Sequence, residues 1–475
     1  MAEQCTGRGA RGVVAAAAPI AAALGAEALR AGGNAFDAAV TAALAETVLM
    51  PPKCGLGGDL VAIRLSAGSR EPDALLAIGG APAGLGAVAR SGAWREVGPL
   101  SVGPPAAPAG YLALAALGRL PFERLAAPAI GLARDGFPWA TVCTRLSEQS
   151  AALVAEMNPD GTVYFPDGSP FAPGAIVRLP GLAAALGELV TRREGFLAGP
   201  VGEAIVRAVR ARGGVLEESD FAAARAEWVP CATGTVGPFV AWATPAPTHG
   251  PSLLDAMATA TAGDTPADLY RRVMQAIAAR RSSLADPSGT SMVSAVDEEG
   301  NAVVVVHSNS FPRFGSGIVV PEYDLVLANR AGRGFTPEPG HPNFPEAGRR
   351  PATTLHAWAL ADETGAPRLL GATPGGANQM PWNAQMLQRV VAGCSEPGLL
   401  VTSPLWEWLP DDDGVRIEGG FDPTEIDGLR DAAPRMTSVS RWGCKSAQQV
   451  VRLPLPGQAA VAAADPRTVG LALGV

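Results

Sequence analysis

The sequence predicts a mixed α+β protein in which helices dominate before residue 289 and strands dominate after it. Helix-like periodicity recurs at 107–117, 122–135, 182–191 and 202–212. After residue 289, β-branched runs alternate with glycine-rich turns and predict strands that include 314–320 and 324–330. One strand is also expected before that point, at 236–244. Of 475 residues, 48% are hydrophobic and 17% are charged, which is enough apolar surface for a large core. The length fits two or three domain-sized units or one large layered domain.

Charge and cysteine content exclude several classes of partner. The net charge is −8 and no basic cluster stands out, which argues against nucleic acid or an anionic membrane surface as partners. Six cysteines form no C-x-x-C pair, and the chain has only four histidines. We therefore predict no metal site, no other cofactor, and reduced thiols in a cytoplasmic protein.

The N-terminal apolar run, 13–24, imitates a signal peptide because two arginines precede it. The run continues, however, into an amphipathic segment that ends at Gly33. We predict a buried strand and a helix over 12–31, followed by a second helix that begins at Asn34 or Asp37 and ends at Leu49. No stretch approaches the roughly 18 consecutive apolar residues that a membrane span requires.

Two further motifs resemble known signatures only in part. The glycines of 55–58 lack G-x-G-x-x-G spacing and lead into a strand, so they do not predict a nucleotide site. His249 lies in a loop, but the chain contains no G-x-S-x-G elbow that would supply a serine partner. We interpret His249 as structural or as lining a site.

The junction between Gly289 and Thr290 is the most informative point in the chain. Strand-like runs at 293–297 and 302–307, separated by a turn ending in Gly-Asn, predict a β-hairpin. Thr290 then lies at or just before the start of a strand, where its hydroxyl can attack the Gly289 carbonyl. Cleavage would leave Thr290 with a free α-amine, whose pKa of about 7.7–8.0 suits a general base. On this motif alone, a structural Gly-Thr is the simpler interpretation.

A second chemical signal lies at Gly375 and Gly376. They end a predicted strand, 369–376, shortly before a predicted helix over 383–391. Backbone amides in such a turn can bind an oxyanion.

Several blocks together carry a resemblance to a known family. They are Gly32-Gly-Asn-Ala-Phe-Asp-Ala-Ala-Val40, Gly55-Leu-Gly-Gly-Asp59, Pro245-Ala-Pro-Thr-His-Gly250, Gly289-Thr-Ser-Met-Val-Ser-Ala-Val-Asp297, Thr373-Pro-Gly-Gly376 and Ala464-Asp-Pro-Arg467. From about residue 12 to the C-terminus, in this order, they resemble γ-glutamyltranspeptidases, which are N-terminal nucleophile hydrolases. The resemblance implies a four-layer αββα sandwich. It also implies autoproteolysis into a helix-rich part, 1–289, and a strand-rich part, 290–475, which remain associated.

By position, the resemblance assigns roles to several residues. Thr290 matches the nucleophile and new N-terminus, and Ser308 matches a hydroxyl bonded to it. Gly375 and Gly376 match the glycines of the oxyanion site. Cleavage is implied between Gly289 and Thr290.

The substrate-reading positions depart from the family pattern. Thr353 and Thr354 replace paired serines that hold a carboxylate, and two hydroxyls keep that hydrogen-bonding chemistry. The family's donor-anchoring arginine is absent, and its ammonium-binding aspartate is replaced in a loop that carries Arg330 and Arg333. An arginine does not bind an ammonium group, so we do not expect efficient recognition of an intact γ-glutamyl head. The loop Asn329-Arg-Ala-Gly-Arg-Gly-Phe335 with Gly340-His-Pro-Asn343 resembles the non-glutamyl, oxamate-amidohydrolase-like branch. Met292 replaces a histidine, and the segment before the cleavage point is short.

These observations lead to one main prediction and two alternatives. The main prediction is a self-processing threonine hydrolase that acts through an acyl-enzyme on a small carboxylate-bearing amide or acyl substrate. Arg330 and Arg333 are its candidate anion anchors. The first alternative is a C–C bond hydrolase of the same family in antibiotic biosynthesis, and the second is an unprocessed, non-catalytic homologue. A homo-oligomer remains open.

Overall fold

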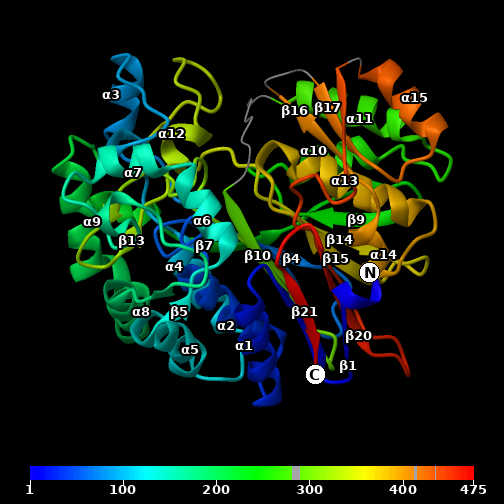
Figure 1. The fold of residues 1–475 in the computed structure, drawn as a ribbon, viewed down its shortest axis with the longest axis horizontal. Coiled ribbons are helices and arrows are strands. Elements are labelled where there is room, and N and C mark those ends of the chain that lie inside the picture. Colours follow the sequence, from blue (N-terminus) through cyan, green and yellow to red (C-terminus); the bar gives the residue numbers. More distant parts are fainter. Residues whose placement is uncertain (281–288, 411–413, 434) are drawn as a thin grey trace.

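The structure, a computed structural model, describes residues 1–280, 289–410, 414–433 and 435–475. Two seven-stranded sheets pack face to face between helical layers, and together they form a four-layer αββα sandwich (Figure 1). This confirms the predicted fold class. No helix in the described ranges combines the length and the apolar character that crossing a bilayer requires.

The first sheet is antiparallel throughout. In spatial order its strands are β1 (Thr6–Gly9), β20 (Ala460–Ala464), β19 (Gln449–Arg452), β15 (Pro367–Ala372), β14 (Ala357–Ala361), β9 (Phe239–Ala243) and β8 (Ala232–Val236). Strands from both sides of residue 289 therefore share this sheet.

The second sheet is also antiparallel. Its strands are, in order, β21 (Leu471–Gly474), β2 (Gly12–Ala16), β10 (Thr290–Asp297), β11 (Ala302–Ser308), β3 (Asp59–Leu65), β4 (Asp73–Ala77) and β7 (Ala226–Pro230). The predicted hairpin is confirmed as β10 and β11, at the centre of the sheet.

Both faces of β10 are buried, and its apolar side chains divide between them. Met292 and Val296 belong to the core between the two sheets. Val293 and Ala295 point the other way, into the core between this sheet and its helices. The alternation follows from the two-residue period of a strand.

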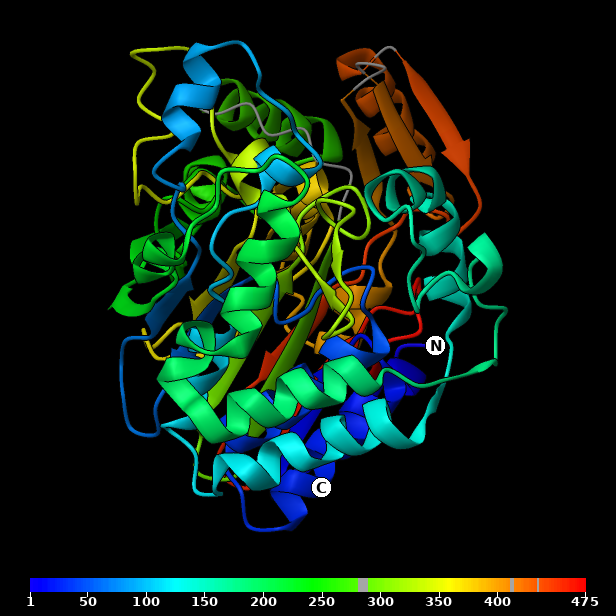
Figure 2. The same cartoon turned by 90° about the vertical axis from the view of Figure 1, so that its left-hand side faces the viewer.

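Helices cover the outer face of each sheet. Over the second sheet and its flank lie α1 (Pro19–Arg30), α2 (Ala35–Leu49), α3 (Leu85–Arg90), α4 (Ala107–Ala115), α5 (Phe122–Asp135), α6 (Thr141–Glu148), α7 (Ala151–Met157), α8 (Pro180–Arg192) and α9 (Pro200–Arg210), and Figure 2 shows this layer from outside. Over the first sheet lie α10 (Gly250–Met257), α11 (Pro266–Ala278), α13 (Gln379–Val391) and α14 (Pro397–Thr402). The Asn34 side chain caps α2 by accepting from the Phe36 and Asp37 N–H groups, and α2 is buried along its whole length.

Several predicted elements need correction. The strand expected at 236–244 is a hairpin, β8 and β9, and α13 begins four residues before the predicted position. Strands expected at 314–320 and 324–330 shrink to β12 (Val319–Val320) and β13 (Leu325–Val326). Gly315 and Gly317 adopt φ of +53° and +83°, which strands do not allow, so the chain turns there.

Other elements were not predicted. They include α12 (Arg330–Gly334), the short pair β5 (Phe137–Pro138) and β6 (Ile176–Val177), and a small unit of β16 (Trp406–Leu409), β17 (Gly414–Glu418), β18 (Met436–Val439) and α15 (Pro423–Ala432). Helix α12 is only five residues long and ends in glycine, so its sequence resembles a loop.

Candidate active site

Thr290 is the first residue of β10 and lies directly opposite Ser308 of β11. Both side chains are buried, at 3% and 1% exposure. The Thr290 hydroxyl donates to Ser308 Oγ at 3.2 Å, and Ser308 Oγ donates to the carbonyl oxygen of Gly289 at 2.8 Å. The Ser310 N–H also donates to Ser308 Oγ, at 2.9 Å. Two coupled hydroxyls thus lie against the carbonyl of the predicted scissile bond.

Only glycine fits at position 289. A Cβ atom there would lie 1.6 Å from the carbonyl oxygen of Ser310, which is far inside van der Waals contact. Backbone therefore approaches backbone closely at the junction, and this holds the Gly289 carbonyl beside Ser308. The shortened pre-nucleophile segment noted in the sequence falls mainly on 281–288, outside the described residues.

Gly375 and Gly376 lie at the same end of the sandwich. The last residue of β15, Ala372, pairs with Gln449, whose side-chain amide donates to the carbonyl of Met292 at 3.0 Å. The turn after β15 therefore leaves the first sheet close to the start of β10. Both glycines have positive φ, +152° and +57°. Neither backbone N–H donates a hydrogen bond to any residue that the structure describes.

Thr353 and Thr354 are both buried, just before β14. The Thr353 N–H donates to the carbonyl of Pro247 at 3.0 Å, which joins this segment to the loop before α10. Thr354 Oγ1 accepts from the Gln379 side chain at 3.4 Å, which joins it to the start of α13. The two threonines therefore lie between the loop before α10 and the start of α13.

The predicted arginines differ in their surroundings. Arg330 is buried, and its Nε donates to Asp59 Oδ2 at 2.9 Å. Asp59 lies opposite Ser308 across β3 and β11, so this ion pair adjoins the hydroxyl pair. Burial raises the pKa of Asp59, although Arg330 opposes that shift. Arg333 instead pairs with Glu96, whose side chain is largely exposed. This ion pair is therefore more exposed than that of Arg330 with Asp59.

Sequence reasoning did not identify Asp59, Arg280 or His356 as parts of this region. Asp59 is the last residue of the glycine-rich block 55–59, which carries the family resemblance but predicted no site. Nothing in the sequence around Arg280 distinguishes this arginine from others. His356 Nδ1 donates to the Thr354 carbonyl at 2.8 Å, and its Nε2 accepts from the Asn383 side chain at 2.8 Å. Burial lowers the pKa of His356 to about 4, so the ring is neutral.

A second buried cluster supports the hairpin from behind. His307 Nε2 donates to Glu46 Oε2 at 2.9 Å, and the Tyr111 hydroxyl donates to His307 Nδ1 at 2.8 Å. Glu46 Oε1 accepts the backbone N–H groups of Ala17 and Ala18. Among the described residues, Glu46, Cys54 and His307 place their ligand-type atoms within 4.8 Å of one another. Hydrogen bonds account for the Glu46 and His307 contacts, so we assign no metal there.

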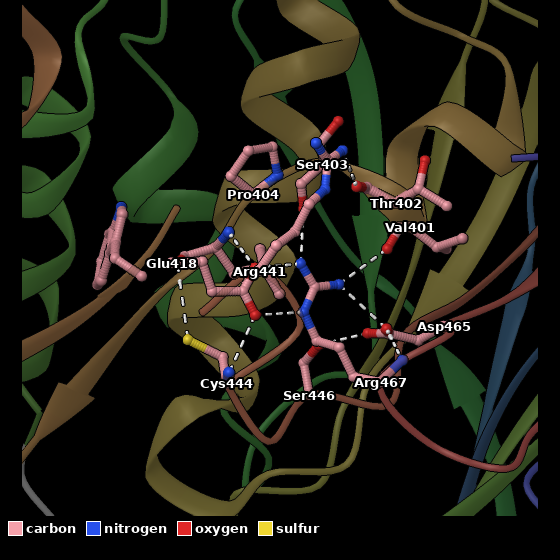
Figure 3. Close-up of polar contacts among 12 residues, drawn as sticks. Val401, Thr402, Ser403, Pro404, Glu418, Arg441, Cys444, Ser446, Asp465 and Arg467 are labelled. Atoms are coloured by element: carbon pink, nitrogen blue, oxygen red, sulfur yellow. Dashed lines mark hydrogen bonds and ion pairs between the residues drawn. The ribbon is translucent and has the colours of Figure 1, made fainter. Parts of the chain in front are cut away.

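A fully paired arginine anchors the C-terminal segment (Figure 3). Arg467 donates to both carboxylate oxygens of Glu418, at 2.7 and 2.5 Å, and to Asp465 Oδ1 at 3.0 Å. It also donates to the carbonyls of Val401 and Ser403. The side chains of Arg467, Glu418 and Asp465 have no exposed surface.

This Arg467 cluster is linked to the Gly375 turn. The Asp465 N–H donates to the carbonyl of Gln448, and the Gln448 side chain donates to the carbonyl of Trp382 at 2.9 Å. A Cβ at Gly375 would lie 2.3 Å from the Trp382 ring, so that ring sets the course of the turn. The C-terminal segment therefore supports the two unused amides.

The chain matches one family model and several known proteins. The model, described as Gamma-glutamyltranspeptidase, matches residues 21–277 and 258–475. The chain is 25% identical to the glutathione hydrolase-like YwrD proenzyme of Bacillus subtilis, over 94% of each chain. It is 26% identical to the oxamate amidohydrolase proenzyme of Klebsiella pneumoniae, over 94% of this chain and 95% of that one. It is 34% identical to the acylase ACY 1 proenzyme of a Pseudomonas species (strain V22), over 46% of this chain and 42% of that one.

Solved structures agree with the fold. The cephalosporin acylase of Bacillus halodurans superposes with a TM-score of 0.86 and 24% identity, over 99% of this chain and 96% of that one. The family model and the acylase structure each match nearly the whole chain, and the family model matches residues before and after residue 289. The protein is therefore a hydrolase of the γ-glutamyltranspeptidase family, with the fold of the N-terminal nucleophile hydrolases.

Proposed function

We propose that the protein is a self-processing threonine hydrolase that acts on a small amide or acyl substrate carrying a carboxylate. The observation that carries the proposal is the hydroxyl pair on the Gly289 carbonyl. Ser308 donates to that carbonyl while it accepts from Thr290, so one hydroxyl polarises the bond and the other is positioned beside it.

The first step is an N-to-O acyl shift within the chain. Thr290 Oγ1 bonds to the carbonyl carbon of Gly289, the C–N bond breaks, and the hydroxyl proton passes to the departing nitrogen. Ser308 stabilises the negative charge that develops on the Gly289 oxygen. Water then hydrolyses the ester, which leaves a Gly289 carboxylate and a free α-amine on Thr290.

The second step uses the new N-terminus on a substrate. The α-amine takes the proton from Thr290 Oγ1, which attacks the substrate carbonyl and forms an acyl-enzyme. The N–H groups of Gly375 and Gly376 are available to hold the oxyanion, because neither donates a hydrogen bond within the described structure. Hydrolysis of the acyl-enzyme by water completes the cycle.

The proposed substrate class rests on Thr353, Thr354 and Arg330. The hydroxyls of Thr353 and Thr354 suit a carboxylate, and Arg330 provides a buried positive charge beside Ser308. Two relatives are named for action on amide or acyl compounds, as an amidohydrolase and an acylase. We therefore favour amide or acyl hydrolysis over cleavage of a C–C bond.

The intact mass of the purified protein under denaturing conditions tests self-processing. We expect two fragments that meet between Gly289 and Thr290, and a single chain for Thr290→Ala. Ser291→Ala is the matched control, because Ser291 is the neighbouring buried hydroxyl and pairs with His307 rather than Ser308. An unmodified chain that stays whole for days would contradict the proposal and would support the non-catalytic alternative.

A further inference from the structure

Three helices of the first-sheet side meet close to the candidate active site. Helices α10, α11 and α13 contact one another. Arg280 lies just beyond the end of α11, and its Nη2 contacts Met380 Sδ, near the N-terminus of α13, at 2.8 Å. His249 is the residue before α10. The N-terminal ends of two helices thus lie near one guanidinium.

This meeting point adjoins the paired threonines. His249 follows Thr248, which forms a bridge with Thr353. Met380 follows Gln379, whose side chain donates to Thr354. The group is therefore continuous with the residues that the proposed function assigns to the substrate carboxylate.

Hydrogen-bonding capacity remains unused in this group. His249 is 5% exposed, and its Nε2 has no partner among the described residues. The buried Nε of Arg280 likewise lacks a partner there, and a thioether sulfur is a weak acceptor for Nη2. Buried cations are normally paired with carboxylates, and the partly buried Arg280 has no carboxylate partner among the described residues.

The electrostatics point in the same direction. Burial lowers the pKa of Arg280 to about 10, and no described carboxylate lies close enough to oppose that shift. Burial, and then the charges of Arg280 and Arg330, lower the pKa of His249 well below its usual value. Helix N-termini add partial positive charge. The potential in this region is therefore positive without a resident counter-charge.

Arg389, at the other end of α13, provides a useful contrast. Burial also lowers its pKa to about 10, but its Nη2 donates to the carbonyl of Pro404, and Glu418 and Asp465 lie near enough to oppose the shift. Arg280 has neither a carbonyl acceptor nor an acidic neighbour among the described residues. The oxygen atoms of an incoming anion would supply both a hydrogen-bond acceptor and a negative charge.

We propose that Arg280 and His249 form an anion subsite that binds an acidic group of the substrate beside Thr353 and Thr354. The inference rests on the proposed function and deepens it. The family resemblance assigns no role to Arg280 or His249, although His249 lies in one of the blocks that carry it. Arg280 would donate through Nε and its terminal nitrogens, and His249 through Nε2–H. The expected ligand class is a short-chain carboxylate.

Calorimetric titration of the wild-type protein with succinate and glutarate tests the subsite, with the neutral diamides succinamide and glutaramide as comparison ligands. We expect at least one dicarboxylate to bind at least about tenfold more tightly than its diamide, since a charge-assisted hydrogen bond has that worth. Arg280→Met should remove this preference, Arg280→Lys should keep part of it, and His249→Gln should weaken it. Arg271→Met, on the exposed face of the same helix, is the control.

The outcomes separate the subsite from the catalytic proposal. Equal binding of dicarboxylates and diamides by the wild type would overturn the subsite, and so would a preference that survives in Arg280→Met. Hydrolysis of the neutral probe butyryl-p-nitroanilide, compared between wild type and Thr290→Ala, reports on the nucleophile alone. Loss of that activity in Thr290→Ala together with equal binding would leave the proposed function intact.

Discussion

The Arg467 side chain is fully enclosed and Arg280 is partly buried, and the two have opposite surroundings. Arg467 donates to two carboxylates and two backbone carbonyls, and its side chain has no exposed surface. Arg280 has a thioether contact and an unpaired Nε. The first arrangement satisfies a guanidinium completely, whereas the second leaves donors for something that binds.

The comparison distinguishes an arginine that joins segments of the fold from one whose donors remain available to a ligand. The Arg467 cluster joins the last strands to the small unit of β16–β18, and through Gln448 and Trp382 it supports the turn at Gly375. Arg280 stabilises nothing comparable within the described residues. Arg330 is intermediate, because its Nε donates to one carboxylate, that of Asp59, which lies opposite Ser308. Of these three arginines, only Arg467 uses all of its donors within the described residues.

The largest effect is expected for Arg467→Met. It leaves Glu418 and Asp465 buried without their partner, which should lower the free energy of unfolding by about 3–5 kcal/mol. Urea unfolding followed by tryptophan fluorescence measures this loss. Arg430→Met is the control, because its pair with Asp427 is exposed and should matter by less than about 1 kcal/mol. If the two variants were equally stable, Arg467 would have no special structural role, and its contrast with Arg280 would be lost.

Ser308→Ala tests the chemical side of the comparison. Without the hydroxyl that donates to the Gly289 carbonyl, self-cleavage should slow by about 10²–10³-fold, as for loss of one oxyanion donor. A time course of intact mass after synthesis measures the rate. Ser291→Ala should cleave at the wild-type rate. If Ser308→Ala also cleaves normally, the hydroxyl pair is structural only.

Arg280→Met should behave unlike Arg467→Met. Removing an unpaired cation from a largely dry site relieves a desolvation penalty, so the free energy of unfolding should stay the same or rise by about 1 kcal/mol. The same urea titration measures it. A loss of about 3 kcal/mol or more would mean that Arg280 has a structural role, and the comparison with Arg467 would fail.

The smallest effect is expected at the β14–β15 turn, where Asp362 pairs with Arg368 at 2.9 Å. Burial acts to raise the pKa of Asp362, but hydrogen bonds from Thr364 and Arg368 lower it to about 2. A lowered folded-state pKa stabilises the protein above about pH 3.9 and loses that effect as pH falls toward 2. Asp362→Asn should therefore cost up to about 1 kcal/mol at pH 6 and progressively less at lower pH. A difference that grows on acidification would contradict this sign.

Local patterns were sufficient for much of the scaffold. The hairpin of β10 and β11 was predictable because β-branched runs flank a Gly-Asn turn, and its first residue is Thr290 as expected. Helix α2 was predictable from its cap residue, Asn34, and the end of its apolar pattern at Leu49. Such signals lie within a few residues of one another, so they do not depend on the rest of the chain.

Other elements had no local signal. The arginine-bearing stretch at 330–334 reads as a loop, yet it forms α12. The pairing of Arg467 with Glu418 joins residues 49 positions apart, and that of Arg330 with Asp59 joins residues 271 positions apart. Ion pairs of this kind leave no periodicity in the sequence.

By itself, the sequence determined the α+β class, the position of Thr290 at the start of a strand, and the glycines at 375 and 376, because strand alternation and backbone freedom are local properties. The layered arrangement was implied by the family resemblance. The tertiary structure alone decided which buried charges are paired. Arg467 meets its carboxylates and Arg280 does not, because that outcome depends on how distant segments pack and on which groups are taken out of water together. The residues that react were visible in the chain, whereas the charges that surround them became visible only in the folded protein.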